Sequence, residues 1–180
     1  MPTTGKGAEF ERDICKKLSL WWTEGERDDV FWRTSGSGSR ATTRGKLSID
    51  TAYSHGDVTF IDPIGKPFID ACLIELKRGY TDSISILDLL DRPSGKMRLV
   101  EWWDKAHEEK VFSGRKWTII IFKRNRREPC VLMCWEMFKQ LRDLYGDLEH
   151  IRIRAKVDLC VIKLSRFLHI HQTFFTIEGI

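Results

Sequence analysis

The sequence predicts an α/β fold in which a central mixed β-sheet is flanked by helices. Three observations predict it: an opening segment with apolar residues at helical spacing, β-rich runs between residues 30 and 76, and a later amphipathic helix followed by a continuous apolar run. The resulting order is helix, strand, strand, strand, helix, strand. Such an order is typical of a sheet that is covered by helices.

The first helix is expected over residues 8–22, where Phe10, Ile14 and Leu18 recur at helical spacing. At about 100° per residue, Glu11 falls inside this apolar stripe. Burying a carboxylate is costly unless a cation pairs with it. We therefore predict that Glu11 has a cationic or metal partner, or lies at the edge of a cleft. The alternative is a glutamate at the stripe's edge that reaches solvent.

The first strands are expected in the segment that follows. Residues 30–33 predict a short strand that leads into a basic loop rich in Ser, Gly and Thr over residues 34–45. The β-rich runs at residues 57–61 and 68–76 predict an antiparallel hairpin whose turn comprises residues 62–67.

The second half of the chain continues the alternation. A helix is expected over residues 99–111, a strand covered on both faces over residues 117–122, and a further strand over residues 130–133. A helix over residues 135–145 and strands over residues 157–164 and 167–177 follow. We expect one domain over residues 1–180, with a core at about residues 5–134 and a C-terminal elaboration over residues 135–180.

Composition excludes several classes of protein. With 42% hydrophobic and 31% charged residues the chain is not disordered throughout. No apolar run reaches the length of a membrane span and the N-terminus lacks the apolar core of a signal peptide, so we expect a cytoplasmic protein. The five cysteines lie in apolar periodic segments and are predicted to be reduced and mostly buried. Five tryptophans are predicted to lie in the core or in a dimer interface, namely Trp21, Trp22, Trp102, Trp103 and Trp117.

Two stretches of the chain carry basic residues and no acid. One spans residues 31–49 and the other residues 113–127. Their basic residues are Arg33, Arg40, Arg44, Lys46, Arg115, Lys116, Lys123, Arg124, Arg126 and Arg127. This unevenness would suit a phosphate-rich ligand such as nucleic acid; the alternative is a solvated basic surface.

A candidate reaction centre lies on the second strand of the predicted hairpin. Side chains alternate along a strand, so Glu75 and Lys77 share a face, and pairing across the hairpin brings Asp57 close to Glu75. Asp57, Glu75 and the carbonyl of Leu76 could bind Mg²⁺, with Mn²⁺ as a substitute, and Glu11 could join directly or through water. Lys77 could position the attacking water or neutralise charge in the transition state. The alternative is a surface ladder of salt bridges worth little energy.

The order of these residues resembles the PD-(D/E)xK nuclease superfamily. Glu11 is followed by Asp57 in HGDV and by Glu75 and Lys77 in IELK, while residues 6–12 (KGAEFER) are similar to archaeal-type Holliday junction resolvases. The resemblance implies a restriction-endonuclease-like core (αβββαβ), Mg²⁺ as cofactor and a homodimer that nicks two strands symmetrically. It covers about residues 5–133. The segment between residues 33 and 57 is longer than in compact resolvases, and residues 135–180 have no counterpart.

The function expected from residues and resemblance together is a Mg²⁺-dependent, structure-selective DNA endonuclease, namely a Holliday junction resolvase of a prokaryotic cell or its phage. Catalytic roles are expected for Glu11, Asp57, Glu75 and Lys77. DNA contacts are expected from Arg12, Arg33, Ser35, Ser37, Ser39, Arg40, Arg44, Lys46, Arg78, Lys123, Arg124, Arg126 and Arg127. Two alternatives are a restriction-like or repair endonuclease acting on duplex DNA and a catalytically silent DNA-binding module of the same fold.

Overall fold

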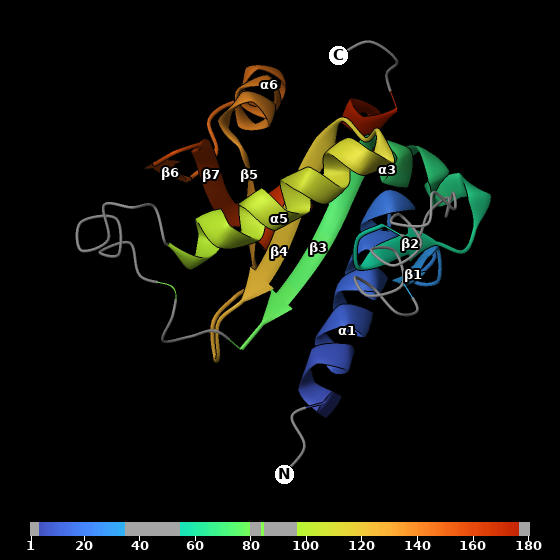
Figure 1. Ribbon diagram of the computed structural model, residues 1–180. Coiled ribbons are helices and arrows are strands. Elements are labelled where there is room, and N and C mark those ends of the chain that lie inside the picture. Colours follow the sequence, from blue (N-terminus) through green and yellow to red (C-terminus); the bar gives the residue numbers. More distant parts are fainter. Residues whose placement is uncertain (1–3, 35–54, 80–83, 85–96, 177–180) are drawn as a thin grey trace.

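A five-stranded mixed sheet forms the centre of the computed structural model, which describes residues 4–34, 55–79, 84 and 97–176. The strands lie in the order β3-β4-β5-β7-β6 (Figure 1). β3 and β4 are parallel, and the other neighbours are antiparallel. The predicted α/β fold with a mixed sheet is therefore confirmed. The bounds are β3 (Cys72–Arg78), β4 (Trp117–Lys123), β5 (Cys130–Cys134), β6 (Ile151–Arg154) and β7 (Asp158–Lys163).

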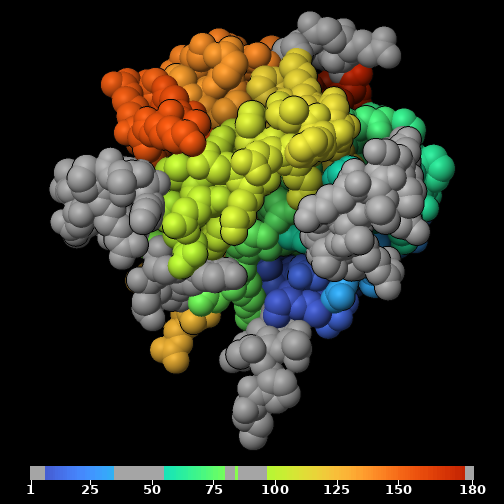
Figure 2. Space-filling model, viewed as in Figure 1, coloured from blue at the N-terminus to red at the C-terminus, as the bar shows by residue number. Residues whose placement is uncertain are grey.

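Helices cover both faces of this sheet. α5 (Arg98–Ser113) crosses one face, in front of β3 and β4 in Figure 1, and spreads over the front of the molecule in Figure 2. The other face packs against α1 (Thr4–Trp22), α6 (Trp135–Tyr145) and α7 (Leu164–Phe167). Along β4, side chains alternate between the two cores, with Ile119 on the α1 side and Ile120 on the α5 side. This burial on both faces confirms the prediction for residues 117–122.

The predicted hairpin is wrong. β2 (Val58–Phe60) pairs antiparallel with β1 (Phe31–Arg33) in a separate two-stranded sheet, and β3 pairs with β4. Between β2 and β3 the chain forms η1 (Pro63–Gly65) and α3 (Lys66–Ala71) instead of a turn and a strand. The side chain of Asp62 accepts a hydrogen bond from the Ile64 N–H, and a proline occupies the start of each helical piece. These helix-starting signals outweigh the β-propensity of residues 68–71.

The predicted strand over residues 167–177 is also wrong, whereas the one over residues 157–164 corresponds to β7. Residues 164–167 form α7, and η3 (Gln172–Phe175) begins where the His171 side chain accepts a hydrogen bond from the Thr173 N–H. The ring of Phe175 packs 4.9 Å from that of Phe68. β6 was not predicted, because it is a four-residue edge strand in which only Ile153 is buried.

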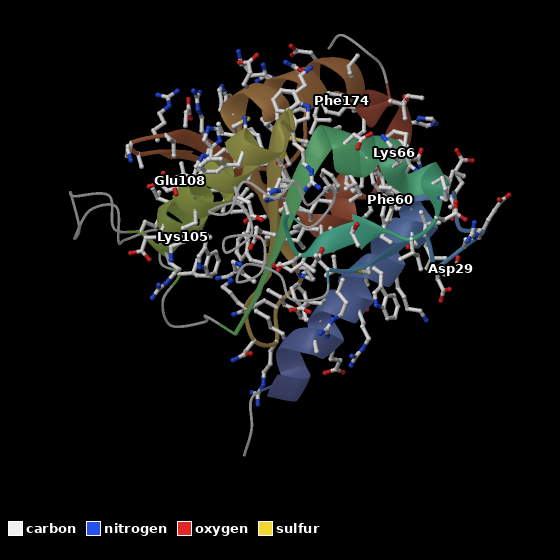
Figure 3. All side chains as sticks on the ribbon, turned by 45° about the vertical axis from the view of Figure 1, so that its right-hand side comes forward. Asp29, Phe60, Lys66, Lys105, Glu108 and Phe174 are labelled. Atoms are coloured by element: carbon white, nitrogen blue, oxygen red, sulfur yellow. The ribbon has the colours of Figure 1, made fainter. Side chains whose placement is uncertain are left out.

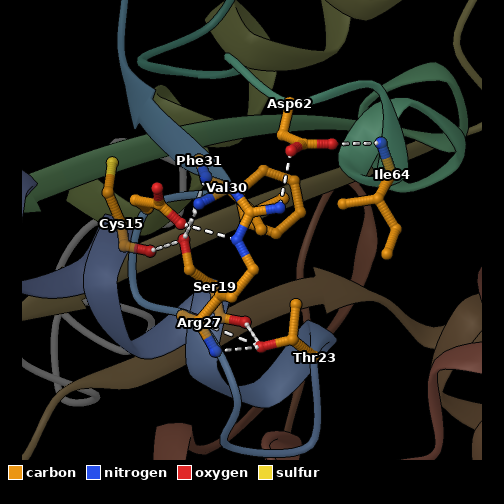
Figure 4. Close-up of polar contacts among 9 residues, drawn as sticks. Cys15, Ser19, Thr23, Arg27, Val30, Phe31, Asp62 and Ile64 are labelled. Carbon is orange, nitrogen blue, oxygen red and sulfur yellow. Dashed lines mark hydrogen bonds and ion pairs between the residues drawn. The ribbon is translucent and has the colours of Figure 1, made fainter.

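Ser19 joins the first helix to the first strand (Figure 4). Its side chain is fully buried; the hydroxyl donates to the Cys15 carbonyl over 2.8 Å and accepts from the N–H groups of Val30 at 3.1 Å and Phe31 at 2.9 Å. Arg27 Nη1 donates a hydrogen bond to Asp62 Oδ2. This bond connects the loop that follows α1 to the start of η1. These contacts fix β1, and hence Arg33, against α1.

The cysteines and the five tryptophans for which burial was predicted follow that prediction, whereas Trp32 is 45% exposed. All five cysteines are free, and Cys15, Cys72 and Cys160 are buried. The tryptophans of α1 and α5 are at most 9% exposed in the single chain, so they belong to its core and do not form an open interface. In the described part of the chain, no helix has the length and apolar character required to traverse a lipid bilayer.

Candidate active site

Two carboxylates and one ammonium group meet at β3, the strand at one end of the five-stranded sheet. Glu75 and Lys77 lie on the same face of the strand, as alternation predicted, and Lys77 Nζ donates a hydrogen bond to Glu75 Oε2. Lys77 Nζ also lies 3.8 Å from Asp57 Oδ2. The side chains of Asp57 and Glu75 are only 12% and 14% exposed. Because the two carboxylates are largely buried, this cluster differs from the ladder of surface salt bridges that was the alternative interpretation.

Asp57 reaches this cluster without the predicted hairpin. Its N–H donates to the Ile74 carbonyl over 2.8 Å, and its Oδ2 accepts from the Leu76 N–H over 2.8 Å. Its carbonyl accepts from the Thr34 N–H at 2.9 Å, just after β1. The residue that precedes β2 is thus bound to the edge of β3 through its backbone and its side chain together. The expected proximity of Asp57 and Glu75 is present, but it arises from a different pairing of strands.

The electrostatics of the cluster favour an additional positive charge. Burial and the negative charge of Asp57 raise the pKa of Glu75, Lys77 opposes the shift, and the resulting pKa is about 7. One ammonium group therefore compensates only partly for two buried carboxylates. Within the described ranges, no group of three or more His, Cys, Asp or Glu side chains is arranged to hold a metal ion. Mg²⁺, however, is commonly bound through one or two carboxylates and keeps several waters, and the pair Asp57 and Glu75 fits that requirement.

Glu11 has the cationic partner that its place in the apolar stripe predicted. Arg33 Nη1 lies 3.5 Å from Glu11 Oε2, with both side chains about one-third exposed. Burial and the negative charges of Glu11 and Asp57 raise the pKa of the Cys15 thiol to about 12, and Arg33 opposes the shift. The charge of Glu11 is therefore compensated by an arginine.

Asp57, which follows a glycine, lies next to a strand that carries the acid-x-lysine motif Glu75 and Lys77. This arrangement is the one to compare with known protein families. The sequence matches the model of the family described as "Phage putative PDDEXK endonuclease" over residues 3–176. The chain belongs to this family. The match confirms the resemblance to the PD-(D/E)xK nuclease superfamily and extends it into the C-terminal part. No curated protein and no solved structure matches the chain significantly.

Basic residues of the chain follow the strand that carries Glu75 and Lys77. Arg78 is paired with Lys123 across β3 and β4, and the Gly79 N–H donates to the Lys123 carbonyl over 3.3 Å. The turn after β4 therefore begins beside the end of β3. Its remaining basic residues are Arg124, Arg126 and Arg127, of which the last two are exposed.

The structure describes only some of the other residues expected to contact DNA. Arg12 is exposed on α1, and Arg78 Nη1 lies 3.7 Å from Glu9 Oε2. Arg115, which belongs to the basic segment but was not expected to contact DNA, is only 7% exposed and donates to the His55 carbonyl. Six of the expected residues, Ser35, Ser37, Ser39, Arg40, Arg44 and Lys46, fall outside the described residues.

Sequence reasoning missed Glu109 of α5. Its Oε1 accepts a hydrogen bond from the Gly56 N–H over 2.8 Å, and its charge adds to those that raise the pKa of Glu75. A signal was available: Glu109 stands seven residues after Trp102 and three after Ala106, on the buried stripe of its helix. The same argument that singled out Glu11 would have found it.

Proposed function

We propose that this protein is a divalent-metal-dependent DNA endonuclease that hydrolyses phosphodiester bonds in branched DNA, with Mg²⁺ as its ion and Mn²⁺ as a substitute. The observation that carries the proposal is the meeting of two mostly buried carboxylates, Asp57 and Glu75, with the ammonium group of Lys77. Like-charged carboxylates are costly to bury side by side, and a cation-binding role explains their presence.

Each residue of the cluster has a proposed part. The carboxylates of Asp57 and Glu75 and the carbonyl of Leu76 hold the ion, and Glu11 contributes through water. When bound, the ion polarises a phosphate oxygen and lowers the pKa of a water molecule. Lys77 lies within reach of both carboxylates and can orient that water or stabilise the negative charge that develops on the phosphate. Arg33 keeps the charge of Glu11 compensated.

We propose that the basic turn, Arg124, Arg126 and Arg127, grips DNA phosphates beside the cut. Replacing all three by Ala should weaken DNA binding and lower the slope of log K against log salt by up to about 0.9 for each phosphate that is no longer neutralised. Fluorescence anisotropy in EDTA at several salt concentrations measures both quantities.

A matched control removes the same charge at the opposite edge of the sheet. Lys139, Arg142 and Arg154 belong to α6 and β6, and β6 is the strand farthest from β3. The triple Ala variant of these residues should leave the salt slope close to that of the wild type. An equal loss in both triple variants would mean that net charge, and not the basic turn, governs binding.

Selectivity for branched DNA is supported by the similarity of residues 6–12 to archaeal-type Holliday junction resolvases. The test compares cleavage of a four-way junction, a flap and a linear duplex that share the same flanking sequence, in Mg²⁺. We expect the junction to be cut at least about tenfold faster than the duplex. A selectivity of that size requires a difference of only about 1.4 kcal/mol in activation free energy between the two substrates. Equal rates on both substrates would favour the restriction-like or repair endonuclease.

We further propose that residues 1–180 form one nuclease domain and that two copies associate. The C-terminal strands β6 and β7 continue the sheet that contains β3, which supports a single domain. A homodimer would allow two symmetric nicks in a junction, in the cytoplasm of a prokaryotic cell or during phage growth. Sedimentation analysis with and without junction DNA tests the association.

A further inference from the structure

We propose that Glu109 and Arg115 are positioning residues for Asp57, because together they hold the peptide unit between His55 and Gly56, one residue before Asp57. Arg115 Nη1 donates to the His55 carbonyl over 3.0 Å, and Glu109 Oε1 accepts from the Gly56 N–H over 2.8 Å. These two backbone groups belong to the same peptide bond. The inference rests on the proposed function of Asp57, and it adds one residue of α5 and one that follows it.

Holding both ends of one planar peptide fixes its orientation. The C=O and N–H of a trans peptide point in opposite directions, so one donor and one acceptor on either side prevent the plane from rotating. Both partners come from the same part of the molecule: Glu109 lies in the last turns of α5, and Arg115 follows directly after its C-cap, Gly114. We call Glu109 and Arg115 the peptide clamp.

The clamped peptide packs closely against β3. Gly56 has φ +78°, and a Cβ at this position would lie 2.8 Å from the Ile74 carbonyl oxygen. The next residue, Asp57, is bound to Ile74 and Leu76 through its N–H and its Oδ2. Between the clamp and β3 the chain therefore has little freedom to turn. Because Gly56 is the one residue between the clamped peptide and Asp57, we expect a rotation of that peptide to displace the Asp57 carboxylate.

The peptide clamp is poorly explained by stability alone. Arg115 is 7% exposed and the Glu109 side chain 25%, so both charges are largely withdrawn from water. Besides accepting from the Gly56 N–H, Glu109 Oε1 lies 3.5 Å from His55 Nδ1, so a second group of these two residues is held. Withdrawing a charged side chain from water is costly. Such a cost is expected where a site must be held in one geometry.

The test uses a conservative and a disruptive change at Glu109. Glu109→Gln keeps an oxygen that accepts the Gly56 N–H, whereas Glu109→Ala removes it. The control is Glu108→Ala on the exposed side of α5, labelled in Figure 3. In the metal-free protein, hydrogen exchange of the Gly56 amide should accelerate about tenfold or more in Glu109→Ala and stay close to wild type in Glu109→Gln and Glu108→Ala.

Cleavage kinetics give the second readout. In Glu109→Ala we expect kcat to fall on the order of 10- to 100-fold with KM for DNA nearly unchanged, because a small misplacement of a reacting group lowers the rate more than it lowers binding. Glu109→Gln should restore most of kcat. Arg115→Lys and Arg115→Ala form a parallel series, and the Glu109 series decides the question if an Arg115 variant does not fold.

The outcomes separate this inference from the proposed function. Unchanged Gly56 exchange in Glu109→Ala overturns the peptide clamp whether or not the protein cuts DNA. Faster exchange of the Gly56 amide in Glu109→Ala, together with a wild-type rate in Glu109→Gln, supports the peptide clamp even if the wild type shows no cleavage. In that case only the proposed function fails. An equal loss of kcat in Gln and Ala, with exchange normal in Gln, means that Glu109 acts through its charge and contradicts a positioning role.

Discussion

Replacing Asp57 by Ala should abolish DNA cleavage, with a loss of at least about 10³-fold in kcat. The change removes one of the two carboxylates that face Lys77 and also the acceptor of the Leu76 N–H. DNA binding should persist, because the phosphate contacts proposed for the basic turn are untouched. Single-turnover cleavage in Mg²⁺ and anisotropy in EDTA measure the two effects separately.

Two further variants identify the reason for the loss. Asp57→Asn keeps an oxygen for the Leu76 N–H but removes the charge, so it should be as inactive as the Ala variant. Asp70→Asn changes an exposed aspartate of α3 that pairs with Lys66 and should cleave like the wild type. Activity of Asp57→Asn or Asp57→Ala within about tenfold of wild type would contradict the role given to this carboxylate.

Glu75→Gln should have opposite effects on catalysis and on stability. Burial holds the pKa of Glu75 in the folded protein at about 7, above its ordinary value of 4.5. Between these values the folded state binds more protons than the unfolded state, so this group makes the protein less stable as the pH rises through the window. Gln carries no such penalty. In metal-free protein the variant should be more stable than wild type at pH 8, by on the order of 1–3 kcal/mol.

The measurement is urea denaturation of both proteins in EDTA at pH 5 and pH 8. The difference in the free energy of unfolding between the variant and the wild type should be small at pH 5 and increase towards pH 8. Mg²⁺ should stabilise the wild type more than the variant. Cleavage by Glu75→Gln should fall by about 10²-fold or more. The same pH dependence of unfolding in the two proteins would show that Glu75 does not carry the penalty.

The local periodicity of the sequence predicted several helices and strands correctly, but it could not predict which strands pair with one another. The 3.6-residue stripe of residues 8–22 and the continuous run of residues 117–122 depend on which side chains are buried, and both correspond to elements of the structure. The supposed hairpin failed because Asp62 and the prolines after it start helical turns. Residues 167–177 failed because aromatic packing of Phe175 against α1 and α3 overrode β-propensity.

The candidate site was accessible from sequence only in part. Alternation along β3 was enough to place Glu75 beside Lys77. Asp57 joins them through bonds to Ile74 and Leu76, a long-range contact that no local pattern encodes. The burial of Arg115 could not be predicted, because a basic residue in a basic segment gives no sign that it is buried.

The most direct measurement locates bound Mn²⁺ by anomalous scattering from crystals of the protein. The account predicts a peak in contact with carboxylate oxygens of both Asp57 and Glu75, which disappears in Asp57→Ala crystals. Mn²⁺ bound elsewhere, with these two carboxylates unable to share it, would contradict the central claim.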